Sequence, residues 1–282
     1  MEAITIPAYA KINLLLDIVG KRQDGYHLLK TVMQNLALCD YISLEKTSSG
    51  IAIETTHPEL PTGRENLAYK AAEVFFKYTG IISGVKISIT KNIPVAAGLA
   101  GGSSNAAAVL TGLNTIYKTG LTPHKLASLG ARLGADVPFC VIGGTVLAEG
   151  IGEKLTLLPS FPRLPVVLVK PDFGVSTAAV YRNFNLESLP ERKTEKTIVA
   201  FKEENFELAL NDLENVLETV TCKMHPEVAE IKLQMQQLGS RVSLMCGSGP
   251  TVFCIAKSMD HAEEIAAHFK KKYREVYATY TI

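Results

Sequence analysis

The sequence predicts an α+β fold built from two domain-sized halves, residues 1–158 and 159–282. Three observations support this prediction. The 282 residues are 47% apolar, which is ample for a packed core, and single cores stop growing near about 250–300 residues. Segments with strand spacing and segments with helical spacing are interspersed in both halves. Three prolines then punctuate the middle of the chain, and the order of the elements changes after them: Pro159, Pro162 and Pro165.

Alternating apolar residues predict the strands of the first half. We expect an initial hairpin, with Asp24-Gly25 as its turn, from residues 12–18 and 28–36. A second hairpin is expected from residues 41–46 and 51–55. Two further strands are predicted, at residues 85–89 and at the apolar run 140–148.

Helical spacing predicts three helices in the first half. The first covers residues 67–78 and ends at Gly80. The second is an alanine-rich helix from Ser103 to Ile116, which we expect a serine to cap. The third covers residues 124–133 and stops at Gly134.

The second half has a different order of elements. A strand at residues 166–170 precedes several helices between Ser176 and Leu238. Two strands, at residues 242–245 and 251–256, flank a Gly-Ser-Gly loop. A helix near residues 262–271 and a strand at residues 275–281 complete the prediction.

Charge and cysteine content exclude several classes of protein. The balance of 29 basic and 28 acidic residues disfavours a nucleic-acid or membrane-surface partner, because both need a basic field. Five cysteines without CxxC spacing disfavour a disulfide framework and a zinc site. Lys11 and Asp17 make the start of the chain a poor signal peptide, and the longest weakly polar stretch, residues 137–148, is too short to span a bilayer. We therefore expect a cytoplasmic protein.

The most informative motif is a glycine-rich loop between a predicted strand and a predicted helix. It reads Pro94-Val95-Ala96-Ala97-Gly98-Leu99-Ala100-Gly101-Gly102-Ser103-Ser104-Asn105. Free backbone N–H groups and the helix dipole make such a helix start an anion site. The loop has neither the lysine of a Walker A loop nor the G-x-G-x-x-G spacing of a dinucleotide fingerprint. The alternative is a turn that only lets the helix pack closely against a sheet.

A second glycine loop lies in the other half, in Cys246-Gly-Ser-Gly249-Pro-Thr251. By itself it fits an ordinary hairpin turn. Together with the first loop it fits the other wall of a phosphate site.

Several polar residues are candidates for chemistry. Lys11 and Asn13 are two residues apart in a strand, so they share a face that is turned to solvent or to a site. Asp136 is either a turn residue making an Asx bond or a partly buried base that needs a cationic partner such as Lys11. Tyr26 and His27 form either a solvated hairpin tip or a surface that stacks on a planar base.

These motifs together resemble the GHMP kinases, named for galactokinase, homoserine kinase, mevalonate kinase and phosphomevalonate kinase. The loop at residues 94–105 resembles their second motif, and residues 246–251 resemble their third. Residues 9–14 (YAKINL) and 20–27 (GKRQDGYH) are similar to the branch that phosphorylates 4-diphosphocytidyl-2-C-methyl-D-erythritol, in the non-mevalonate isoprenoid pathway. This resemblance covers the whole chain. It implies an S5-like N-terminal ATP-binding domain and a ferredoxin-like C-terminal domain.

The resemblance also implies roles for individual residues. ATP would lie along Pro94–Ser104, with Asn66 and Leu67 near the adenine. Lys11 and Asp136 match the catalytic positions. The substrate contacts would come from five residues, with Tyr26 and His27 around the cytosine of cytidine diphosphate methylerythritol: Asn13, Tyr26, His27, Thr177 and Tyr181. The sequence matches the family less closely around Ser176, Thr177 and Tyr181 than elsewhere in the chain.

The resemblance leaves other points open. Mg²⁺ should bridge the phosphates, and Ser103 or Ser104 would help to hold it, but no acidic metal ligand stands out. Alanine replaces glycine at three loop positions, which should tighten the conformations open to the loop: Ala96, Ala97 and Ala100. We expect a monomer or a weak homodimer. The rival interpretations are another GHMP small-molecule kinase, a non-catalytic relative that binds a nucleotide or a partner, and an RNA-binding module, which the charge balance disfavours.

Overall fold

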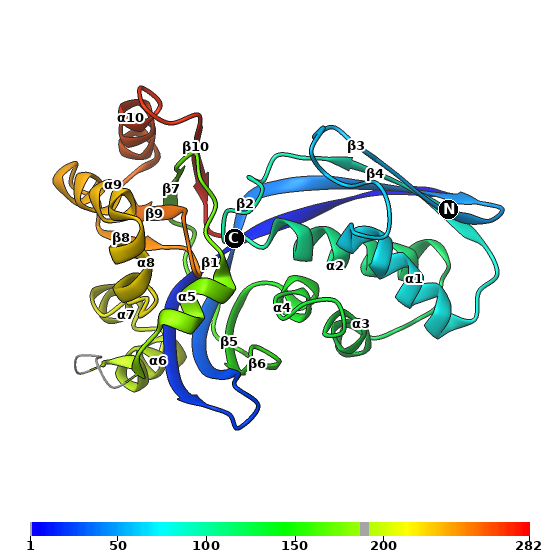
Figure 1. The fold of residues 1–282 in the computed structure, drawn as a ribbon, viewed down its shortest axis with the longest axis horizontal. Helices are drawn as coiled ribbons and strands as arrows, with labels where there is room; N and C mark the ends of the chain where they lie inside the picture. The colour runs from blue at the N-terminus through cyan, green and yellow to red at the C-terminus, as the bar shows by residue number, and fades with distance from the viewer. Residues whose placement is uncertain (1, 187–191) are drawn as a thin grey trace. The chain divides into compact units, whose positions relative to one another are not determined.

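A computed structural model describes residues 2–186 and 192–282 of the chain (Figure 1). The residues form two compact units, and each unit draws on several stretches of sequence. Unit 1 comprises Met1–Ala10, Leu38–Val95 and Ala100–Gly143. Unit 2 comprises Lys11–Ala37, Ala96–Leu99 and Gly144–Ile282. The sequence boundary near residue 158 stays a prediction.

The strands and helices follow the predicted order, with the exceptions given below. The strands are β1 Ala3–Lys21, β2 His27–Thr47, β3 Gly50–Thr55, β4 Gly84–Thr90, β5 Thr145–Gly150, β6 Lys154–Leu157, β7 Pro165–Lys170, β8 Val242–Met245, β9 Val252–Ile255 and β10 Glu275–Tyr280. The helices are α1 Leu67–Thr79, α2 Gly101–Ile116, α3 Pro123–Gly130, α4 Val137–Ile142, α5 Thr177–Asn183, α6 Thr194–Lys202, α7 Phe206–Asn211, α8 Glu218–Met224, α9 Pro226–Gln237 and α10 Met259–Phe269. None of the helices in the described part of the chain has the length and apolarity that crossing a bilayer requires.

In unit 1, the second hairpin predicted from the sequence is wrong. Residues 41–46 continue the long strand β2, and β4 pairs antiparallel with this part of β2. Strand β3 pairs parallel with β4 instead of with β2. Gly84 permits this pairing, because a Cβ there would lie 2.3 Å from the backbone carbon of Ser49. Helices α1 and α2 cover one face of these strands (Figure 1), and their alanines and Phe75 fill the core.

Two helix starts in unit 1 differ from the predictions. Helix α2 begins at Gly101, so the predicted serine cap is wrong; Ala100 is the N-cap residue, in the left-handed region at φ 58°, and it makes no side-chain capping bond. The predicted strand over residues 140–148 is wrong in its first part, where α4 occupies Val137–Ile142. Pro138 favours a helix start, and Gly143, at φ 71°, ends the helix before β5.

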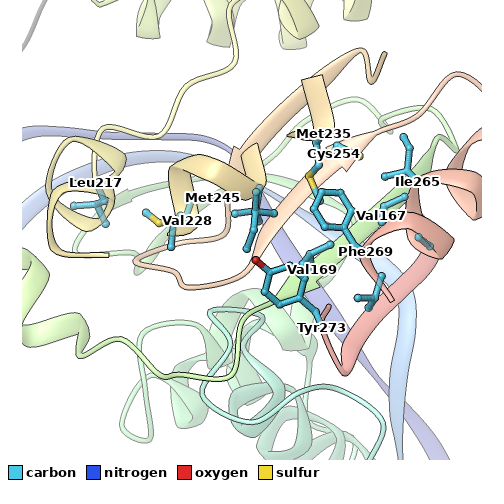
Figure 2. Close-up of a cluster of buried hydrophobic side chains, with 14 of the residues drawn as sticks. Val167, Val169, Leu217, Val228, Met235, Met245, Cys254, Ile265, Phe269 and Tyr273 are labelled. Atoms are coloured by element: carbon cyan, nitrogen blue, oxygen red, sulfur yellow. The ribbon is translucent and has the colours of Figure 1, made fainter. Parts of the chain in front are cut away.

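Unit 2 contains an antiparallel sheet in the order β10-β7-β9-β8. All four of these strands were predicted from the sequence, but their order in the sheet was not. Helices α9 and α10 pack on it and bury a continuous apolar core. Figure 2 shows this core, where Val167 and Val169 of β7 meet Met235 of α9 and Phe269 of α10. Strand β5 pairs with β2 and with β6, which the sequence analysis did not predict.

Candidate active site

In unit 2, β1 places Lys11 and Asn13 side by side, which confirms their predicted shared face. Both are buried, at 4% and 3% exposure, so Lys11 does not lie at a solvated strand end. The Lys11 ammonium donates to Asn13 Oδ1 at 2.8 Å, and Asn13 Nδ2 donates to Thr31 Oγ1 at 2.8 Å. Thr31 in turn donates to the Leu15 carbonyl at 2.6 Å. This chain of hydrogen bonds fixes the positions of both the ammonium and the amide.

The two glycine loops touch each other within unit 2. A Cβ on Gly98 would lie 2.5 Å from the Cys246 carbonyl oxygen and 3.2 Å from that of Gly249. A Cβ on Gly247 would lie 3.7 Å from Lys11 Nζ and 3.6 Å from Asn13 Oδ1. The second loop is therefore a hairpin turn that also lies against Lys11. Burial raises the pKa of the Cys246 thiol to about 12, so this cysteine is not a nucleophile at neutral pH.

Gly98 is required by both its conformation and its contacts. Its φ is +76°, and any side chain would meet backbone atoms of the other loop. Gly120 has a similar φ of +67° in open space, so Gly120→Ala is the matched control. We expect Gly98→Ala to lower the free energy of unfolding by about 1–3 kcal/mol more than the control does. Chemical denaturation of both variants measures the difference, and equal losses would contradict the close contact.

In unit 1, the start of α2 offers backbone donors. The first helical hydrogen bond runs from Ser104 N–H to the Ala100 carbonyl, at 2.8 Å. The N–H groups of Gly101, Gly102 and Ser103 therefore stand outside the helical ladder. Ala100 is an L-residue in the left-handed region, which costs about 1–2 kcal/mol. Ala100 therefore adopts a conformation that glycine would adopt without this cost.

A buried ion pair supports the segment before α2. The Lys91 ammonium contacts Asp40 Oδ2 at 2.7 Å, and both side chains are almost fully buried. Asp40 Oδ1 also accepts the N–H groups of Asn92 and Ile93, each at 2.7 Å. A Cβ on Gly101 would lie 3.1 Å from Lys91 Nζ. Glycine at position 101 therefore leaves room for the ammonium beside the start of the helix.

Asp136 lies at the N-cap position of α4 but makes no side-chain capping bond to that helix. The Asx bond that the sequence left open for Asp136 is therefore not made to the first turn of α4. The turn before it adjoins the start of α2, because a Cβ on Gly134 would lie 3.8 Å from Ser103 Oγ. Ser104 differs from Ser103, since it is 3% exposed and its hydroxyl donates to the Tyr9 carbonyl at 2.7 Å.

Asn66 and Leu67 also lie in unit 1. Asn66 caps α1 by accepting the Ala68 N–H at 2.9 Å, and its amide donates to the Pro61 carbonyl at 2.8 Å. The side chain of Leu67 faces α2: a Cβ added to Gly102 would lie 3.6 Å from Leu67 Cδ1. Of the two predicted adenine neighbours, Leu67 is therefore the one whose side chain reaches the glycine loop.

The hairpin tip between β1 and β2 is closed by backbone bonds and leaves Tyr26 62% exposed. His27 lies instead in an aromatic cluster, 5.3 Å from the Tyr181 ring and 6.0 Å from the Phe184 ring, centroid to centroid. Burial of the ring lowers the pKa of His27 below its usual value, and the positive charge of Lys21 lowers it further. Phe184 is missing from the predicted residues; it follows the last residue of α5 in extended backbone, and its partner His27 lies far away in the sequence.

Helix α5 links this aromatic cluster to the second glycine loop. Tyr181 is four residues after Thr177, so both lie on one side of the helix. The hydroxyls of Thr177 and Ser248 are 2.8 Å apart. Ser176 caps the helix through the N–H of Ala179. Among the described residues, no group of three or more His, Cys, Asp and Glu side chains is arranged to hold a metal ion.

Comparison with known proteins identifies the family. A model of the GHMP kinase N-terminal domain matches residues 66–144, and a model of the GHMP kinase C-terminal domain matches residues 188–275. A 4-diphosphocytidyl-2-C-methyl-D-erythritol kinase of Clostridium beijerinckii is 48% identical over 98% of this chain and 99% of its own length. The kinase of the same name from Moorella thermoacetica is 46% identical, with both chains covered in full.

Solved structures agree with this result. A 4-(cytidine 5'-diphospho)-2C-methyl-D-erythritol kinase, 36% identical, superposes with a TM-score of 0.85 over 99% of both chains. A homoserine kinase from Cytophaga hutchinsonii shares the fold at 18% identity, with a TM-score of 0.78 over 99% of this chain and 95% of its own. Because full-length relatives are nearly half identical and both domain models match in order, the chain belongs to the GHMP kinase family.

Proposed function

We propose that this chain transfers the γ-phosphoryl group of ATP to the 2-hydroxyl of 4-diphosphocytidyl-2-C-methyl-D-erythritol. The observation that carries the proposal is the full-length identity of 46–48% to relatives named as kinases of this substrate. The structure adds support within unit 2, where Lys11 lies against two touching glycine loops.

Phosphoryl transfer depends mainly on positioning and on stabilisation of charge, so few residues need to react. In this proposal Asp136 orients the substrate hydroxyl and accepts its proton. Lys11 neutralises charge on the transferring group. The backbone N–H groups at the start of α2 hold the oxygens of the ATP phosphates, as donors in an oxyanion hole do. Leu67 borders the adenine, beside Asn66.

The residues at the start of α2 also fit Mg²⁺, which prefers oxygen ligands and keeps several from phosphates and water. Ser103 offers a half-buried hydroxyl next to the turn that carries Asp136, whereas the hydroxyl of Ser104 is engaged with Tyr9. Ser103 is therefore the serine that would hold the ion. When bound, Mg²⁺ would offset the charge of the phosphates.

The aromatic cluster of unit 2 supports a site for the cytosine. In this proposal His27 and Tyr26 flank the base, while Tyr181 and Phe184 hold the His27 ring in place. Asn13 and Thr177 would contact the remainder of the substrate. The lowered pKa of His27 keeps its ring neutral at pH 7, so the ring offers one donor and one acceptor to the base.

His27→Ala should raise the KM for the cytidyl substrate by about 10-fold to 100-fold, because stacking on a base contributes about 1–3 kcal/mol. The KM for ATP should stay nearly unchanged. His124→Ala, at an exposed position of α3, is the control. In the wild-type protein the same KM should be flat from pH 8 to pH 7 and rise only as the pH falls through the lowered pKa of His27. Equal increases in both KM values would place His27 away from the base.

A coupled ADP-release assay tests the proposed function. The cytidyl substrate, mevalonate and homoserine are compared at equal concentration with the purified chain and MgATP. We expect turnover with the cytidyl substrate and only background release with the other two. Preferred turnover of mevalonate or homoserine would replace the proposed substrate with that of another GHMP kinase.

A further inference from the structure

The carbonyl oxygens of the second glycine loop are held from one side by two buried polar side chains. Asn215, which is 5% exposed, donates from Nδ2 to the carbonyls of Met245 and Gly247, each at 2.8 Å. Thr221 of α8 is fully buried and donates from its hydroxyl to the Ser248 carbonyl at 3.2 Å. Three carbonyls in a four-residue stretch therefore point toward these two side chains.

This arrangement sets the direction of the Ser248 N–H group in the loop. The peptide between Gly247 and Ser248 is trans, so its N–H points opposite to the carbonyl that Asn215 holds. Within the loop, the N–H of Cys246 donates to Thr251 and the N–H of Gly249 donates to Cys246. The N–H groups of Gly247 and Ser248 have no protein acceptor within residues 2–186 and 192–282, although both residues are buried. Buried donors of this kind are normally paired, so these two are suited to a ligand.

Asn215 also connects the loop to the strand that carries Lys11. Its backbone lies in a short parallel pairing with Leu16 of β1. The Leu16 N–H donates to the Glu214 carbonyl at 2.8 Å, and the Val216 N–H donates to the Leu16 carbonyl at 2.9 Å. One residue thus fixes the second glycine loop relative to β1, and so relative to Lys11 and Asn13.

We propose that Asn215 is a positioning residue for phosphoryl transfer, which holds the Ser248 N–H group toward the phosphates bound beside Lys11. The proposal rests on the kinase function proposed above. Asn215 touches neither ATP nor the acceptor; it acts through the loop. Its second role is local, because Oδ1 accepts the Leu217 N–H at 3.0 Å ahead of α8. The two roles use different atoms of the amide and can be separated by substitution.

Asn215→Asp separates them. The carboxylate keeps the acceptor for Leu217 but removes both N–H donors and faces two carbonyl oxygens. We expect kcat to fall by about 10-fold to 100-fold, as for the loss of a group that orients charge-stabilising donors. The KM for ATP and for the acceptor should change by less than about 3-fold, because a donor used mainly in the transition state affects kcat. Asn205→Asp is the matched control: Asn205 is exposed, and its side-chain oxygen accepts a hydrogen bond from Leu208 N–H at the start of α7. It should retain wild-type kinetics.

Hydrogen exchange provides a readout that needs no substrate. The amides of Cys246 and Gly249 are protected by bonds within the loop, so both should exchange at least about 10-fold faster in Asn215→Asp and at the wild-type rate in Asn205→Asp. Thr221→Val keeps the shape of the side chain and removes its hydroxyl. It should also lower kcat and speed the exchange of the Cys246 and Gly249 amides, by smaller factors than Asn215→Asp does. If Asn215→Asp does not fold, Thr221→Val tests the proposal in its place.

Unchanged exchange together with unchanged kcat in the loop variants would overturn the proposal. A fall in activity with normal loop exchange and a parallel rise in both KM values would also overturn it, since that pattern indicates a general structural role. If the wild-type chain fails to phosphorylate the cytidyl substrate, the proposed function fails. The loop-holding role is then judged by exchange alone.

Discussion

Asp136→Asn is expected to lower kcat for the cytidyl substrate by about 100-fold or more while the KM for ATP stays close to the wild-type value. The substitution keeps the shape of the side chain and removes the carboxylate that we propose as the proton acceptor. General-base assistance typically accounts for about 10²–10⁴-fold in rate. Steady-state kinetics with both substrates varied measures the split between kcat and KM.

The control for this variant is Asp260→Asn. Asp260 is an exposed carboxylate in the first turn of α10, so it tests the charge change without the proposed chemistry. Its kinetics should match those of the wild type. Near-normal turnover of Asp136→Asn would remove Asp136 from the role of base.

Lys11→Met should also lower kcat by about 100-fold or more, because removal of one charge-stabilising group at a reaction centre typically costs about 10²–10³-fold. Methionine preserves most of the buried volume but leaves Asn13 Oδ1 without its ammonium donor. Some stability is therefore lost as well, and kcat must be expressed per folded molecule, measured by circular dichroism on the assayed sample.

Lys170→Met is the matched control for the loss of a buried lysine. Lys170 is 9% exposed, lies on β7 in the same unit and pairs with Glu275 at 2.5 Å. This variant should lose stability and keep its kcat per folded molecule. A fall in kcat equal to that of Lys11→Met would mean that burial of a lysine, not its place beside the glycine loops, is what matters.

The double variant Lys11→Met, Asp136→Asn tests whether both residues serve one step. When two residues act as a unit, the double variant loses far less activity than the product of the two single fold-losses. We expect the double variant to be nearly as active as the worse single variant. Multiplicative losses would assign the two residues to separate steps.

Much of the architecture and part of the candidate site could be predicted because the responsible signals are local. The alternation around Lys11 and Asn13 correctly predicted one shared face, since side-chain direction in a strand has a period of two. The glycines at 98 and 247 predicted two loops of special conformation, and both have positive φ. Gly80 correctly predicted the end of α1, where it adopts the left-handed conformation at φ 69°.

The errors arose where partners distant in sequence decide the structure. Strand β3 pairs with β4, some 30 residues later, instead of with its neighbour β2. The apolar run from residue 140 fits a strand or a helix equally well by periodicity, and Pro138 was the signal that favoured a helix. Asn215 and Phe184 were missed for the same reason: their partners Gly247 and His27 lie far away in the sequence.

The most direct test of the central claim is the structure of the product. The chain is incubated with MgATP and the cytidyl substrate, and the purified product is analysed by mass spectrometry and by phosphorus and carbon NMR. We expect one added phosphate, present as a monoester on the 2-hydroxyl, with the diphosphate unchanged. A product phosphorylated at another hydroxyl or on the diphosphate, or no product at all, would contradict it.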